Sequence, residues 1–158
     1  MAIEIERKFL LADDGWRSIA DNGTRLVQGY LLGAKQASVR VRIEGKQAFL
    51  NIKSATIGTR RQEYEYAIPM QEAEDMLTSL CEKPLIDKIR YNVYHQGQHW
   101  EIDVFSGDNT GLLVAEIELE DEQQAVILPR WIGEEVSHDP RYYNVNLVKH
   151  PYSIWQNK

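Results

Sequence analysis

The sequence has little of several features that classify a protein quickly. It contains one cysteine, Cys81, among 158 residues, so no disulfide can form within the chain and a reducing compartment is expected. No apolar run approaches the roughly 18 residues that a membrane-spanning helix needs. The first residues, MAIEIERKFLL, place acids where a secretion signal has an apolar run. These absences predict a cytoplasmic protein with no membrane partner.

The common nucleotide-binding signatures are also missing. The chain has neither the GxxxxGK[ST] loop nor the GxGxxG turn. The formal net charge of −6 disfavours nucleic acid as the partner, because proteins that bind phosphate backbones usually carry a basic excess. With 43% hydrophobic and 27% charged residues, and no internal repeat, residues 1–158 are expected to form a single domain.

Most of the chain alternates between apolar and polar residues with a period of two, which is typical of β-strands with one buried face. The expected strands are residues 3–11, 24–32, 38–44, 47–53, 62–68, 88–95, 99–105 and 112–119. Eight antiparallel strands joined by turns favour a closed or nearly closed barrel, because closure removes exposed edges. We therefore predict a mainly β fold, an eight-stranded antiparallel β-barrel with a few flanking helices.

The expected helices are fewer and short. Residues 69–80 begin with proline and carry acids in the early turns, as a helix N-terminus prefers. Residues 121–127 and 13–20 are two further short candidates. In the tail, Ser137 is expected to be the N-cap of a short helix. The segment of about 129–150 is expected to form a lid or plug on the barrel.

The polar faces of the strands carry charges of one sign at positions i and i+2. The six pairs are Glu4/Glu6, Arg40/Arg42, Glu63/Glu65, Lys88/Arg90, Glu101/Asp103 and Glu116/Glu118. Members of a pair stand roughly 6.6 Å apart and repel by about 2–3 kcal/mol at an effective dielectric constant near 20. Taken singly, each charged face is most simply exposed to water. A surface selected only for solubility would mix the signs along a strand, so the uniform pairs indicate two kinds of ligand.

The acidic pairs suit hard cations and the basic residues suit a polyanion. Mg²⁺ or Mn²⁺ prefers carboxylate oxygens, and the candidate ligands are Glu4, Glu6, Asp103, Glu116 and Glu118, with Glu63 and Glu65 as further acids of the same interior. A triphosphate carries about four to five negative charges, which six cations match: Lys8, Arg40, Arg42, Lys53, Lys88 and Arg90.

Roles within this set follow from position and chemistry. Lys8 shares a face with Glu4 and Glu6, so it is expected to orient the attacking water or, with a lowered pKa, to deprotonate it. Arg40 and Lys53 are expected to act on the reacting phosphate. Arg61 is expected to reach in from its loop. Tyr30 is expected to contact the product end.

In chain order these residues resemble a known family. The segment Glu4-Ile5-Glu6-Arg7-Lys8 matches the ExExK signature of CYTH proteins, also called triphosphate tunnel metalloenzymes. The remaining pairs and the single Lys53 follow in the family's order over nearly the whole chain. The tail from Trp131 to Asn144 resembles the short bacterial members, with Ser137 where threonine is expected. The resemblance implies a tunnel of eight antiparallel strands with the charges inward, and Mg²⁺- or Mn²⁺-dependent chemistry on a small-molecule triphosphate.

The short subgroup is most similar to inorganic tripolyphosphatases, so hydrolysis of tripolyphosphate to pyrophosphate and phosphate is the favoured function. A class IV adenylyl cyclase, which converts ATP to cAMP and pyrophosphate, would use the same metals. A non-catalytic polyphosphate-binding module would need the cations but not the acidic pairs. A structural barrel with an exposed charged face would bind no phosphate. The protein is expected to be a monomer or a homodimer.

Overall fold

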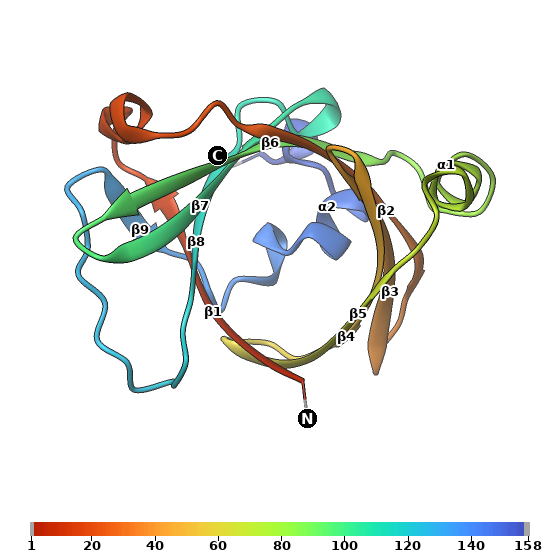
Figure 1. The fold of residues 1–158 in the computed structure, drawn as a ribbon, viewed down its shortest axis with the longest axis horizontal. Coiled ribbons are helices and arrows are strands. Elements are labelled where there is room, and N and C mark those ends of the chain that lie inside the picture. Colours follow the sequence, from red (N-terminus) through yellow and green to blue (C-terminus); the bar gives the residue numbers. More distant parts are fainter. Residues whose placement is uncertain (1, 157–158) are drawn as a thin grey trace.

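The computed structural model describes residues 2–156, and its main feature is a barrel of eight antiparallel strands (Figure 1). The barrel strands are β1 (Ile3–Leu11), β2 (Thr24–Gly33), β3 (Ala37–Glu44), β4 (Gln47–Ser54), β5 (Arg60–Ala67), β6 (Ile86–His95), β7 (Gln98–Phe105) and β8 (Leu113–Glu118). Each predicted strand is present, with its ends at most two residues from the expected ones. The prediction of a mainly β fold built on an eight-stranded antiparallel barrel is confirmed.

Strand β1 closes the barrel because it pairs with a different neighbour along each half. The strands follow the order β5-β4-β3-β2-β6-β7-β8-β1, and β5 also pairs with β1. Near its start, Ile3 stands opposite Gln62 of β5. Further along, Glu6 stands opposite Glu118 of β8. The first strand therefore joins the two edges of the sheet, which leaves no edge of the barrel open along this seam.

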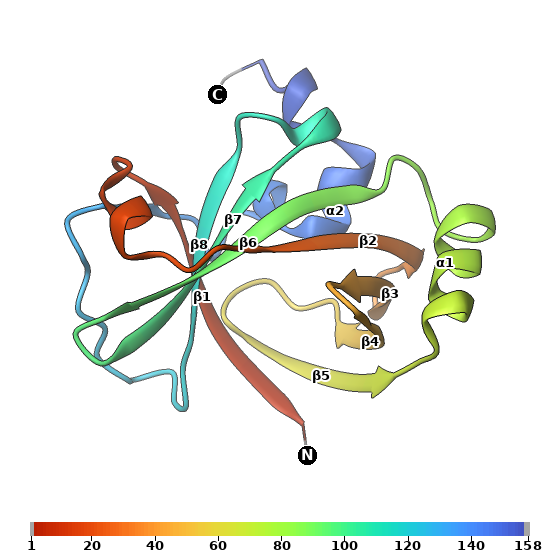
Figure 2. The same cartoon turned by 45° about the horizontal axis from the view of Figure 1, so that its top comes forward.

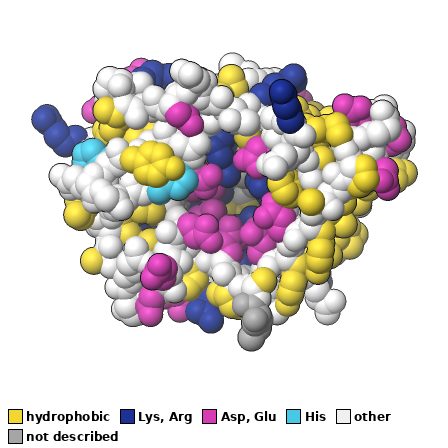
Figure 3. All heavy atoms as spheres, in the orientation of Figure 1, with side chains coloured by type: hydrophobic (Ala, Val, Ile, Leu, Met, Phe, Trp, Pro, Cys, Tyr) yellow, Lys and Arg dark blue, Asp and Glu magenta, His cyan; other side chains and the backbone are white. Residues whose placement is uncertain are grey.

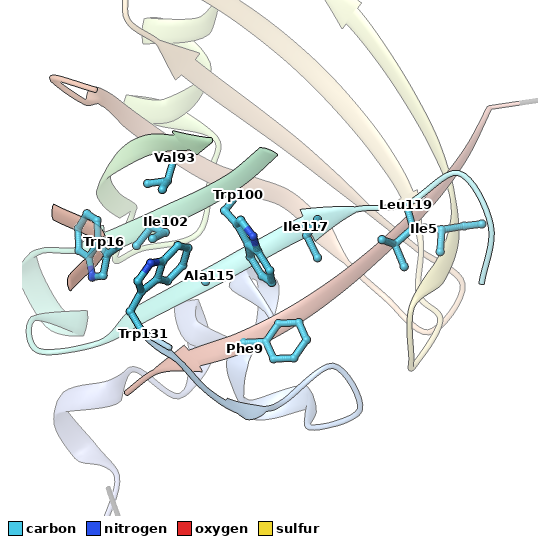
Figure 4. Close-up of a cluster of buried hydrophobic side chains, with 10 residues drawn as sticks. All are labelled: Ile5, Phe9, Trp16, Val93, Trp100, Ile102, Ala115, Ile117, Leu119 and Trp131. Carbon is cyan, nitrogen blue, oxygen red and sulfur yellow. The ribbon is translucent and has the colours of Figure 1, made fainter. Parts of the chain in front are cut away.

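The hydrophobic core lies outside the barrel wall, not in its lumen. Ten buried side chains form its largest cluster (Figure 4), and they are Ile5, Phe9, Trp16, Val93, Trp100, Ile102, Ala115, Ile117, Leu119 and Trp131. Most of them come from the outward faces of β1, β6, β7 and β8. Trp16 and Trp131 cover this face from the flanking segments. Since successive side chains of a strand point to opposite faces, the alternate polar residues are directed into the lumen.

One α-helix covers another part of the wall. Helix α1 (Met70–Ser79) buries Ala73 and Leu77 against Val41 of β3 and Ala48 of β4 (Figure 2). This helix agrees with the expected one at 69–80. At 13–20 the chain forms a short 3₁₀ helix, Gly15–Ile19, which buries Trp16.

Two expectations for short helices are wrong. Residues 121–127 form no helix: the chain turns at Asp121 and continues without regular structure. There the side chain of Gln98 pairs with both the N–H and the carbonyl of Ile127, at 2.9 and 2.7 Å, which replaces helical hydrogen bonds. Ser137 is not an N-cap, because its hydroxyl accepts from the backbone N–H of Lys8 at 2.9 Å and donates to Glu135.

The tail crosses one end of the barrel. Strand β9 (Ile132–Glu135), which the pattern did not predict, adds to the far end of β1 through the pairs Phe9–Glu135 and Leu11–Ile132. A 3₁₀ turn, Pro140–Tyr142, and helix α2 (Asn144–Lys149) follow. In Figure 1 this blue segment is seen through the barrel. Among residues 2–156, no helix combines the length and the apolar character that crossing a bilayer requires.

Candidate functional site

The barrel encloses a charged cavity, which we call the lumen. Its volume is about 330 Å³, and side chains from all eight barrel strands line it. Seven of the lining residues are basic and eight are acidic, so the charges nearly balance. Every residue predicted for the site lines the lumen except Asp103, and their individual roles stay predictions. The expectation that Arg61 reaches in from a loop is wrong, because Arg61 lies within β5, opposite Glu4 of β1.

The charges are arranged along the barrel axis. Bases lie next to the tail: Lys8 Nζ is 5.8 Å from the ring of Tyr143, and Lys88 Nζ is 3.0 Å from Asn144 Oδ1. Two other acids that line the lumen, Glu65 and Glu118, are exposed to solvent. Figure 3 shows acids around the opening of the hollow, with basic side chains deeper inside. The lumen therefore has an acidic mouth and a basic covered end.

At the covered end, two bases of β6 form ion pairs with one buried acid of β7. Arg90 donates from Nε and Nη2 to the two oxygens of Asp103, at 2.7 and 2.9 Å, and Lys88 Nζ lies 2.7 Å from Asp103 Oδ2. Burial would raise the pKa of Asp103, but Arg90 and Lys88 hold it below its ordinary value. Burial lowers the pKa of Lys88 to about 8, against the opposing effect of Asp103. Asp103 thus orients the two bases, an arrangement that argues against its predicted role as a metal ligand.

At the seam between β1 and β8, acids and bases alternate. Lys8 Nζ lies 3.3 Å from Glu116 Oε1, and Arg90 Nη2 lies 3.5 Å from Glu116 Oε2. Burial would raise the pKa of Glu116, but Lys8, Arg90 and Lys88 hold it well below its ordinary value. Burial would lower the pKa of Lys8, but Glu116 and Glu6 raise it above its ordinary value. The structure therefore favours a positively charged Lys8 over the alternative of a lowered pKa.

The acids of this seam have the donor chemistry of a site for a divalent metal ion. Burial and the neighbouring Glu116 and Glu4 carboxylates raise the pKa of Glu6 well above its ordinary value. Burial, Glu4 and other acids also raise the pKa of Glu118. The nearby bases do not offset the negative charge of these crowded carboxylates, and Mg²⁺ or Mn²⁺ would offset it. Within residues 2–156, however, no three acid, imidazole or thiol groups yet stand close enough to enclose a metal ion.

Arg40 is a buried cation without a counter-ion. Its exposed fraction is 7%, and it forms no ion pair with any described residue. Its Nε has no hydrogen-bond partner, and the same is true of Nε in the neighbouring Arg42. Arg40 and Arg90 both lower the pKa of Arg42, after burial itself. Since buried charges are normally paired, this group of guanidinium ions indicates a missing anion.

The tail supplies lumen residues that the strand pattern could not show. Asn144 Oδ1 accepts from Gln28 Nε2 at 3.1 Å and from Lys88 Nζ at 3.0 Å. The ring of Tyr143 lies 5.8 Å from Lys8 Nζ and 5.9 Å from the guanidinium carbon of Arg61. Asn144 ends the tail segment that resembles the short bacterial CYTH proteins, so the sequence did point to this residue. Nothing in the sequence distinguishes Tyr143 from the other tyrosines.

Comparisons with known proteins agree with this geometry. The sequence model of the CYTH domain matches residues 2–152. An inorganic triphosphatase of Acetivibrio thermocellus is 49% identical over 152 residues, which cover 96% of this chain and 97% of that protein. One from Nitrosomonas europaea is 41% identical over 151 residues, covering 92% and 96%. A crystal structure of an inorganic triphosphatase superposes with a TM-score of 0.66 at 37% identity, covering 94% of this chain and 95% of that one.

Proposed function

This chain belongs to the CYTH domain family, and we propose that it is a metal-dependent hydrolase that cleaves inorganic tripolyphosphate to pyrophosphate and orthophosphate. The relatives that share more than 40% of its sequence over nearly their whole length are inorganic triphosphatases. The chemistry of the lumen supports the same activity without reference to them.

The observation that carries this proposal is the unpaired charge of Arg40. A buried guanidinium with no counter-ion is costly unless a ligand completes its environment. Because Arg40 and Arg42 are adjacent on one face of β3, a ligand that satisfies both must carry several negative charges. Arginine forks match the geometry of phosphate oxygens, so a chain of phosphates meets this requirement.

The remaining bases would complete the grip on the phosphates. Lys53, Arg61, Lys88 and Arg90 line the same cavity as Arg40 and Arg42. Several of them are now paired with lumen acids: Lys53 Nζ lies 3.3 Å from Glu4 Oε2, for example. Substrate binding therefore exchanges partners, since phosphate oxygens replace carboxylates at the bases and the acids become free to ligate metal.

The metal would be held by acids of β1 and β8, the candidates being Glu4, Glu6, Glu116 and Glu118. When bound, Mg²⁺ or Mn²⁺ would neutralise charge on the phosphate oxygens and polarise the bond that breaks. Lys8 would donate hydrogen bonds from its ammonium at the seam and so orient the attacking water. Phosphoryl transfer depends mainly on positioning and on electrostatic stabilisation, which a rigid ring of charged strands can supply.

A phosphate-release assay tests the proposal. Tripolyphosphate, ATP, GTP, thiamine triphosphate and pyrophosphate are each incubated with the protein and either Mg²⁺ or Mn²⁺. We expect orthophosphate from tripolyphosphate, loss of this activity in Arg40→Gln, and full activity in Lys46→Gln, a matched change at an exposed hairpin tip. Cyclic AMP with pyrophosphate from ATP would identify a cyclase instead. Tripolyphosphate binding without metal-dependent release would identify a non-catalytic module.

A further inference from the structure

A second cavity lies behind the covered end of the lumen. Its volume is about 210 Å³, and we call it the rear cavity. The connection between β4 and β5 forms one wall, through residues 55–57, and the tail forms another, through Pro140, Asn146 and Lys149. Four residues line both the rear cavity and the lumen, and they are Ser38, Arg61, Tyr143 and Val145. The partition between the two cavities is therefore made of individual side chains.

The rear cavity has the chemistry of an anion site. Its charged lining residues, within the described part of the chain, are both basic: Arg61 and Lys149. Hydroxyl groups come from Ser38, Ser54 and Thr56, and none of the lining residues is acidic. This composition contrasts with the lumen, where acids and bases nearly balance. An anion would therefore meet attraction here from both walls and no carboxylate.

The two cations of the rear cavity keep side-chain N–H donors that no described residue accepts. Lys149 forms no ion pair within residues 2–156. Arg61 Nη2 lies 3.7 Å from Glu4 Oε2 and 3.9 Å from Glu6 Oε1, both longer than a hydrogen bond. A guanidinium offers five N–H donors, and no described residue accepts one from Arg61. Arg61 can thus bind an oxyanion while it remains near the lumen acids.

Tyr143 fixes the partition in place. Its hydroxyl donates to the carbonyl of Ser137 at 2.6 Å and accepts from the backbone N–H of Gly58 at 3.0 Å. These bonds connect the tail to the loop between β4 and β5, so both walls of the rear cavity are held by one side chain. A site assembled in this way is already formed before any ligand arrives.

We propose that the rear cavity is a second anion site that binds orthophosphate and receives the phosphate produced at the covered end of the lumen. The inference rests on the proposed function. Water adds to a terminal phosphorus, the bond from that phosphorus to the bridging oxygen breaks, and the products are orthophosphate, pyrophosphate and the released proton. In a lumen with one mouth, the product at the covered end could leave only after the product nearer the mouth. A phosphate site beyond Arg61 removes this obligatory order.

Product inhibition separates the two sites. Orthophosphate in the lumen competes with tripolyphosphate and raises KM, whereas orthophosphate in the rear cavity binds together with substrate and lowers kcat. We expect both effects in the unmodified protein. Lys149→Glu and, on the opposite wall, Thr56→Asp should weaken the effect on kcat at least five-fold and leave the effect on KM in place. Lys46→Glu, the same change at an exposed hairpin tip, should alter neither effect.

A binding measurement tests whether the rear cavity binds orthophosphate, and it needs no turnover. Orthophosphate is titrated by calorimetry into the protein, both free and with its lumen filled by a non-hydrolysable imido analogue of tripolyphosphate. The filled protein should still bind one orthophosphate, and Lys149→Glu should abolish this binding while Lys46→Glu retains it. Equal orthophosphate binding by the unmodified protein and Lys149→Glu, in both states, would overturn the rear site. Absence of phosphate release from tripolyphosphate would overturn the proposed function. Titration of the free protein and of Lys149→Glu would still show whether orthophosphate binds in the rear cavity.

Discussion

Lys8 and Glu116 stand directly opposite each other where β1 meets β8, with Lys8 Nζ 3.3 Å from Glu116 Oε1. Both side chains are buried, so each is the other's counter-ion inside the barrel. Elsewhere in the described lumen, Arg40 and Glu118 form no ion pair, so the lumen can accept a polyanion and a metal ion together. Either ligand alone would satisfy one sign of charge and leave the other uncompensated.

The first prediction concerns this coupling. Tripolyphosphate together with Mg²⁺ should raise the melting temperature by more than the sum of the two separate shifts. At about 100 times the dissociation constant, binding stabilises by about 2.7 kcal/mol, which corresponds to roughly 5–10 °C for a chain of this size. Differential scanning fluorimetry measures the shift, with Arg40→Gln as the variant that should respond least. An unchanged melting temperature with both ligands present would contradict the enclosed binding site.

The second prediction separates stability from activity at Glu118. This acid forms no ion pair with a described residue, and burial together with Glu4, Glu63 and Glu101 raises its pKa. Glu118→Gln should therefore keep or slightly raise the stability of the metal-free protein, because repulsion is relieved. The same change should weaken Mg²⁺ activation of phosphate release by roughly ten-fold or more, in line with the loss of a metal-site group.

A metal titration of turnover, combined with a urea melt of the metal-free protein, tests both effects. Glu122→Gln, an exposed acid of the following loop, serves as the control and should change neither measurement. A large loss of stability in Glu118→Gln would show that this acid supports the fold instead of the metal.

Features of this site that depend on residues close in the sequence could be predicted, and those that depend on residues distant in the sequence could not. The inward direction of Glu4, Arg40 and Glu116 follows from alternation within a strand, which is local, and the barrel follows from repeating that alternation. The facing pair Glu6–Glu118 could not be derived in this way, because it depends on the register at which distant strands close. The fold and the lumen were therefore predictable, whereas the partners of each charge were not.

The failures have the same origin. The acids and glutamines of 121–127 favour a short helix locally, but Gln98 from β7 takes both backbone groups of Ile127. Ser137 has the side chain of an N-cap, yet β1 presents the N–H of Lys8 to it. In both segments a partner that is remote in sequence overrides a local preference, and neither partner is identifiable from the pattern alone.

The third prediction compares two arginine–aspartate pairs of similar geometry. Arg90 binds both oxygens of Asp103 in the interior, and Arg25 binds both oxygens of Asp87 on the surface. Arg90→Gln leaves the buried Asp103 with Lys88 as its one remaining ion pair among the described residues and removes a partner of Glu116, so it should lower the free energy of unfolding by about 3–5 kcal/mol. Arg25→Gln should cost at most about 1 kcal/mol, because its pair is exposed and screened. Urea unfolding of the two variants gives both values, and equal losses would contradict the assigned burial.

The last prediction is a pH dependence at the junction of the tail with β1. Arg7 donates to both oxygens of Glu135 at 3.0 and 2.8 Å, and Ser137 donates to the same carboxylate at 2.6 Å. The hydrogen bonds from Arg7 lower the pKa of Glu135, and the one from Ser137 adds to the effect. Because the pKa is lower in the folded state than in the unfolded chain, the stabilisation is present above the ordinary glutamate value of 4.5 and is lost as pH falls through the folded value.

Glu135→Gln should therefore lower the free energy of unfolding by about 0.5–1 kcal/mol at pH 7, the size expected for a partly exposed pair. Near pH 3 the variant and the unmodified protein should approach the same stability, since protonation removes the charge from Glu135 itself. Urea unfolding at both pH values measures the difference, and Glu134→Gln, an exposed neighbour without an ion pair in the described chain, is the control. A stability difference that persists unchanged at low pH would mean that Glu135 acts through packing, because a charge contribution must vanish when the carboxylate is protonated.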